Sequence, residues 1–143
     1  MYTHHTYRTG AGAYARVGVE SSAMSASPHQ LIVMLFDGAK TAIAMARHHM
    51  AGGDVQAKGN AISKAIDIVD NGLRASLDAQ AAGAEGASLV ANLTALYGYI
   101  VQRLLQANLR NDAAALDEAE SLLDNVASAW REIGAVGEPH VSQ

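Results

Sequence analysis

Six consecutive large apolar residues, Leu31-Ile32-Val33-Met34-Leu35-Phe36, stand two residues after Ser27-Pro28. Serine followed by proline is typical of a helix start, because the serine oxygen caps free backbone N–H groups and proline suits the first helical position. With about 3.6 residues per turn, six residues surround the helix axis more than once. One face of this helix therefore points into a core, and the other apolar side chains need cover from elsewhere.

Apolar residues recur at helical spacing through most of the chain and predict four long helices. Glycine commonly ends a helix, and aspartate commonly caps the next one. The expected bounds are Pro28 to Met50 or Ala51, residues 55–78, residues 88–110 and residues 113–133. Because the connections are short, we expect an all-α fold, an antiparallel four-helix bundle.

The segments outside the bundle are expected to be less regular. Residues 1–26 combine small side chains with scattered apolar anchors, so we expect a mobile, partly helical N-terminal arm. Residues 27–133 then form the bundle, and residues 134–143 form a flexible tail. Two glycines also predict a loop over residues 79–87.

The composition excludes several function classes. Only ten of the 143 residues are Lys or Arg, the net charge is −4, and no basic stripe suited to nucleic acid is present. No apolar run approaches the ~20 residues of a membrane span, and the N-terminus lacks the features of a secretory signal. The absence of cysteine excludes disulfides and fits a reducing compartment, so we expect a cytoplasmic protein.

Sequence motifs for catalysis are also missing. There is no Gly-Lys dipeptide for a phosphate loop and no Gly-x-Ser-x-Gly elbow. Adjacent helical residues point about 100° apart, so His48 and His49 do not chelate one ion as an i,i+4 pair would. We therefore expect no enzyme, no metal and no cofactor. Asp37 is expected to be solvated or to accept a hydrogen bond from another helix.

Four runs of the sequence carry a joint pattern: MSASPHQLIVMLFDGA at 24–39, KAI at 64–66, NLTALYGY at 92–99 continuing through RLLQANLRND at 103–112, and AWREI at 129–133. Together they resemble the signature of the flagellar secretion chaperones called FliS, and enteric members above all. The resemblance covers the chain from about Tyr14 to Ile133. Phe36 stands where tyrosine is common, and GAEGA at 83–87 departs from the family in a way that suggests a late start of the third helix.

This resemblance implies a monomeric helical chaperone of the cytosol that binds the C-terminal segment of flagellin. Binding would prevent premature polymerisation and keep flagellin competent for type III export. The family also engages the export gate protein FlhA when loaded with flagellin. No nucleic acid and no membrane insertion are implied, and an anti-sigma factor as a second client is left open.

A chaperone for an amphipathic segment needs apolar grooves with anchors at helical spacing. We expect one groove from outward-facing residues of the first helix: Ile32, Val33, Phe36 and Ile43. In this arrangement the core side of that helix carries a different set: Leu31, Met34, Leu35, Ala42 and Met45.

A second groove is expected from outer residues of the third helix: Val90, Tyr97, Val101 and Leu105. Monomers seldom expose large contiguous apolar patches. We therefore expect the arm, with Tyr14, Val17 and Met24 as anchors, to cover part of this surface until flagellin displaces it.

Two other functions stay open at this point. A small helical enzyme or metal protein would need polar side chains converging inside the bundle, where the stripe positions are almost all apolar. A self-associating structural or adaptor bundle would pair its surplus apolar face with a second copy. Light scattering with and without flagellin separates this last function from a chaperone.

Overall fold

A computed structural model describes residues 25–80 and 83–137. The chain divides into two units between Leu31 and Ile32. In the first unit, the Ser27 Oγ accepts a hydrogen bond from the Gln30 N–H at 3.1 Å, and the Gln30 Oε1 accepts one from the Ser27 N–H at 2.9 Å. This reciprocal capping box fixes the start of α2 (Pro28–Ala51), as the serine–proline signal predicts.

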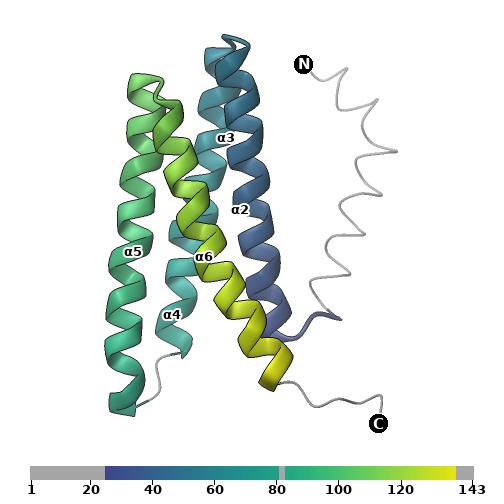
Figure 1. Cartoon of the computed structure of the whole chain (residues 1–143), viewed down its shortest axis with the longest axis vertical. Helices are drawn as coiled ribbons and strands as arrows, with labels where there is room; N and C mark the ends of the chain where they lie inside the picture. The colour runs from purple at the N-terminus through teal and green to yellow at the C-terminus, as the bar shows by residue number, and fades with distance from the viewer. Residues whose placement is uncertain (1–24, 81–82, 138–143) are drawn as a thin grey trace. The chain divides into compact units, whose positions relative to one another are not determined.

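From Ile32 onward, the described residues form four helical rods that run alternately up and down (Figure 1). The all-α bundle predicted from the sequence is therefore confirmed. The rods are α2; a continuous rod of α3 (Val55–Asp67), the π-helix η1 (Ile68–Arg74) and α4 (Ala75–Gln80); α5 (Gly83–Arg110); and α6 (Ala113–Gly137).

The two short turns at one end of the bundle use left-handed backbone. Gly53 has φ 75° after α2, and Asn111 has φ 54° after α5. An aspartate follows each of them and caps the next helix. Asp54 accepts from the Ala57 N–H at 3.0 Å, and Asp112 accepts from the Ala114 N–H at 3.0 Å. Tight turns of this kind hold neighbouring helices antiparallel.

The core side of α2 differs from the one predicted. Phe36 and Ile43 are fully buried and Ile32 nearly so, whereas Leu31 and Met45 are exposed. Met34 and Leu35 are only half-buried. The observed stripe lies one residue further on than the predicted one, and it adds Ala39 and Ala46, small residues that allow close helix approach.

The second rod contains a seven-residue π-helix where the apolar spacing predicts an α-helix. One row of buried residues in this rod recurs every four positions, at Ala61, Ala65, Val69, Leu73 and Leu77, and Ile62 is buried beside it. In an α-helix that spacing turns the stripe by about 40° per step, away from the core. The wider i→i+5 turn of η1 rotates it back. At Gly72, an added Cβ would lie 3.1 Å from the Leu35 Cδ2, so glycine lets α2 approach here.

Two helix ends extend beyond their predicted bounds. α5 begins at Gly83 rather than near residue 88, so the predicted loop at 79–87 and the late start are both wrong. α6 continues to Gly137 instead of ending at Ile133. In both places alanine-rich sequence sustains the helix despite glycines, whose cost of about 1 kcal/mol each is small beside a long packed helix.

Ion pairs join α2 to α6 on the surface of the bundle. Lys40 contacts Asp124 at 2.8 Å, and Arg47 contacts Glu120 at 2.7 Å. Arg131 donates to the Asp37 carboxylate at 2.6 Å, which confirms the expected hydrogen bond from another helix. These pairs are partly exposed, so each adds less than about 1 kcal/mol. They fix the partner of α2 more than they stabilise the bundle.

Candidate partner-binding surface

An apolar pocket of about 380 Å³ opens between α4, α5 and α6. We call it the α4–α5–α6 pocket. Its lining is Leu77, Gly86, Leu89, Val90, Leu93, Asn125, Val126, Ala129, Trp130 and Ile133. Leu77 is buried, while Leu89 and Ile133 are each 59% exposed. With Asn125 as the one amide among apolar side chains, this pocket suits an apolar side chain rather than a polar ligand.

The outer face of α5 carries a second apolar feature, a strip made of Gly98, Val101, Leu105 and Leu109. Val101 is half-buried, Leu105 is 46% exposed and Leu109 is 82% exposed. A Cβ placed on Gly98 would meet nothing within 4 Å. Glycine inside a helix costs about 1 kcal/mol relative to alanine, and no contact in the described chain requires it here. A partner can therefore approach α5 closely at Gly98, beside the exposed Leu105 and Leu109.

Polar contacts occupy the opposite side of α5, where it meets α6. The Tyr99 hydroxyl donates to the Glu118 carboxylate at 2.6 Å, and the Arg103 Nε donates to the same carboxylate at 2.7 Å. The hydrogen bond from Tyr99 is the main cause that lowers the pKa of Glu118, and it also raises the pKa of Tyr99. This cluster is engaged within the chain, so the apolar strip is the side of α5 left for a partner.

The structure corrects four of the predicted groove residues. Ile32, Phe36, Ile43 and Tyr97 were expected to face outward, but all four are buried in the core. Burial also raises the pKa of Tyr97 to about 12. On α2 the error has the cause given above, and on α5 the Tyr97 ring lies on the same face as Ile100 and Leu104, which form the core.

The other predicted groove residues divide into three groups. Val90 lines the α4–α5–α6 pocket, and Val101 and Leu105 lie in the strip. Val33 is half-buried on α2 and lines neither feature. Tyr14, Val17 and Met24 lie outside the described residues. Three predicted residues, all from the third helix, therefore lie in the two apolar features, but they do not share one groove.

Several pocket residues were not predicted as part of a groove, Trp130 and Ile133 of α6 among them. In the sequence, both lie on the apolar stripe of the last helix, a position typical of core residues. Both stand near the end of that stripe, at the end of α6 remote from the tight turn at Asn111, where they line the pocket together with residues of α5.

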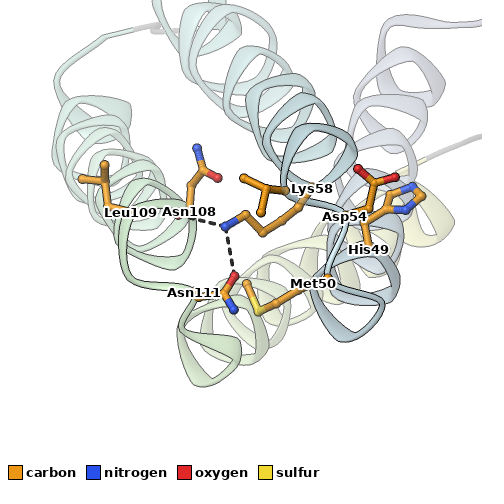
Figure 2. Close-up of a pocket in the computed structure, with 9 residues that line it drawn as sticks. His49, Met50, Asp54, Lys58, Asn108, Leu109 and Asn111 are labelled. Atoms are coloured by element: carbon orange, nitrogen blue, oxygen red, sulfur yellow. Dashed lines mark hydrogen bonds between the residues drawn. The ribbon is translucent and has the colours of Figure 1, made fainter.

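A second pocket, of about 310 Å³, lies near the two tight turns (Figure 2). We call it the Lys58 pocket, because Lys58 is the buried charged residue of the described chain, with 4% exposure. Its Nζ donates to the Asn108 carbonyl oxygen and to the Asn111 Oδ1, each at 3.0 Å. These bonds tie the start of α3 to the end of α5.

Neither pocket has the side chains of a metal centre. In residues 25–80 and 83–137, no group of three or more His, Asp or Glu residues is placed to share an ion. His48 and His49 instead contact each other edge to face, with ring centroids 5.3 Å apart. Within those same ranges, no helix combines the length and the apolar character that crossing a bilayer requires.

Comparison with known proteins matches this helical chain to one family. The profile described as "Flagellar protein FliS" covers residues 10–137. The chain belongs to the FliS family. The flagellar secretion chaperone FliS of Salmonella typhimurium is 56% identical over 133 residues, 93% of each chain. FliS of Escherichia coli K12 is 52% identical over 123 residues, 86% of this chain and 88% of its own.

A more distant FliS relative is the flagellar secretion chaperone FliSB of Pseudomonas aeruginosa. It is 40% identical over 117 residues, 82% of this chain and 89% of its own. The names of these relatives describe chaperones, not enzymes. The family resemblance predicted from the sequence is thus confirmed, enteric relatives included.

Proposed function

We propose that this chain is a cytosolic export chaperone that binds the C-terminal segment of flagellin. The α4–α5–α6 pocket and the outer strip of α5 would hold apolar anchors of that segment. While these anchors are bound, the segment cannot pair with other flagellin subunits before export by the flagellar type III system. Membership of the FliS family and the names of its enteric relatives support the chaperone role.

The observation that carries this proposal is the open apolar pocket beside the half-buried Trp130. Its volume of about 380 Å³ lies in the lower part of the range for ligand sites, so it accepts one or two side chains. A helix that docks in a groove inserts anchors at i, i+3, i+4 and i+7. The pocket would take one such anchor, and the strip from Val101 to Leu109 would take others.

The energetics suit reversible binding. Ordering a long segment on docking costs ~2–5 kcal/mol of the gross interaction energy. Each apolar side chain of the client that becomes fully buried returns about 1.5–3 kcal/mol. A few anchors therefore give net binding that remains weak enough for release. We propose that release follows when the loaded complex meets the export gate protein FlhA.

Charge insertion at the pocket rim tests this proposal. Leu89→Glu places a carboxylate at an exposed rim position, so the fold should persist, as circular dichroism and urea unfolding would report. Desolvating that charge on docking should weaken flagellin binding by roughly tenfold or more, measured by titration calorimetry. Met45→Glu is a matched control, because Met45 is about as exposed but lies on α2, away from both features.

The outcomes separate the alternatives. Equal affinity of wild type and Leu89→Glu for flagellin would exclude the pocket as a docking site. Binding that survives deletion of the flagellin C-terminal segment would exclude that segment as the client. Light scattering measures the oligomeric state with and without flagellin. A homodimer that persists when flagellin is added would favour a self-associating structural bundle over a chaperone.

A further inference from the structure

Lys58 has an incomplete set of partners for a buried ammonium group. The group carries three N–H donors, and two of them meet the Asn108 carbonyl and the Asn111 side chain. Among the described residues, no third acceptor and no ion pair is found for it. A buried charge without a counter-charge is costly. The negative end of the α5 dipole offsets only part of that cost.

The surroundings of Lys58 are apolar at the mouth and cationic at the floor. Val55, 72% exposed, and Leu109, 82% exposed, are the most exposed large apolar side chains of the described chain, and both line this pocket. Figure 2 shows the Lys58 Nζ directed between Asn108 and Asn111, with His49 and Asp54 on the other side of the pocket. The complementary ligand therefore combines an apolar side chain with a carboxylate.

The acidic residue of this pocket does not neutralise Lys58. The Asp54 Oδ1 accepts the Ala57 N–H and so caps α3. That cap leaves the first N–H of α3, at Val55, without an intrahelical acceptor, as at every helix start. The Asp54 carboxylate offsets the positive end of α3, so the attraction for an anion comes from Lys58.

We propose that the Lys58 pocket binds the terminal α-carboxylate of the client's C-terminal segment, together with an apolar side chain close to that end; this rests on the function proposed above. Continuity with the outer strip of α5 favours a chain end. Val101, Leu105 and Leu109 span about 12 Å along α5, and Leu109 belongs to both the strip and the pocket rim. A segment that follows the strip would reach Lys58 as it ends.

The size of the pocket agrees with a chain end. About 310 Å³ is near the lower limit for ligand sites and accommodates a terminal residue or two. Capture of a C-terminal carboxylate is a recurrent mode of peptide recognition. Here the third donor of Lys58 would complete its bonding, and the rim formed by Val55 and Leu109 would exclude water from the ion pair.

The test compares two synthetic peptides of the flagellin C-terminal segment, one ending in the free acid and one in the amide, on the unaltered full chain. The proposal expects the amide to bind roughly tenfold more weakly, because it loses a charge-assisted hydrogen bond. Equal affinity of the two peptides overturns the inference and leaves the proposed function intact. If neither peptide binds, the proposed function itself fails, and the inference with it.

Variants of the chain locate the effect. In Lys58→Met the acid and the amide should bind alike, whereas Lys64→Met, which removes an exposed cation of the same helix, should keep the tenfold difference. Where Lys58→Met does not fold, Leu109→Ser serves instead, because a side chain so exposed is not needed for folding. It should reduce the affinity difference between the acid and the amide, because water then reaches the ion pair, and an unchanged difference would count against the pocket. If peptide affinity falls only when acidic side chains of the peptide are neutralised, and not when its terminal carboxylate is amidated, the inference is also overturned.

Discussion

The two faces of α5 are both apolar, but only one of them belongs to the core. Tyr97, Ile100, Leu104 and Ala107 face inward and are nearly or fully buried. Leu105 and Leu109 face outward with Gly98, whose Cα lies beside open space. The difference teaches that apolar character alone does not identify a core residue. What matters is whether the chain's own helices cover the side chain.

The covering helices explain the difference. The inner face of α5 packs on α3, η1 and α6, whose own buried residues complete one core cluster. Consecutive residues such as Leu104 and Leu105 point about 100° apart, so one falls inside this cluster and the next falls outside it. The pair therefore offers a direct experimental comparison of the two faces.

Truncation of the inner leucine should produce the largest effect. Leu104→Ala removes a fully buried side chain and leaves a cavity, which should lower the free energy of unfolding by about 2–5 kcal/mol. Urea unfolding followed by circular dichroism measures this change. A loss below about 1 kcal/mol would mean that the inner face is not the packed core described above.

Truncation of the outer leucine should leave the fold intact and weaken the binding of flagellin. Leu105→Ala is expected to change the free energy of unfolding by no more than about 0.5 kcal/mol, since the side chain is 46% exposed. Flagellin affinity should fall roughly fivefold, because about 1 kcal/mol of apolar burial on docking is lost. Titration calorimetry on the same preparation measures the affinity for flagellin. Unchanged affinity would show that the strip is not part of the binding site.

The fold was largely predictable, because helix starts and stops are encoded locally. Ser27-Pro28 and the turn at Asn111-Asp112 act on their neighbours through caps that sequence patterns identify. The π-helix was not predicted, although the recurrence of apolar residues at every fourth position is visible in the sequence. The apolar spacing alone predicts an α-helix, and the wider turn becomes evident only when the whole four-residue row is seen to stay buried.

The candidate site was less predictable than the fold. The surplus of apolar residues was assigned to α2, where Phe36 and Ile43 prove to be core residues. Ala39 and Ala46 also lie on the buried face of α2, because small side chains let helices approach closely. Lys58 carried no signal at all, since its burial depends on a turn 50 residues away.

A methyl group added to the strip should separate stability from binding. Gly98→Ala improves helix propensity at a site where the new Cβ meets nothing, so the free energy of unfolding should rise by about 0.5–1 kcal/mol. The same methyl group would hold a docked segment away from α5, and flagellin binding should weaken a few-fold. A variant that is both more stable and a better binder would show that Gly98 is not a contact point.

The smallest effect is expected from removing the hydroxyl group of Tyr97. Burial raises the pKa of Tyr97 to about 12, so the native state keeps this proton after the unfolded chain has lost it. Stability from this group is therefore present below the ordinary tyrosine pKa near 10 and is lost as the pH rises towards about 12. Tyr97→Phe should match the wild type at pH 7 and lose less stability in that alkaline range. Because Tyr97 belongs to the inner face, the variant should bind flagellin as tightly as the wild type does. Weaker binding would show that Tyr97 contacts the client.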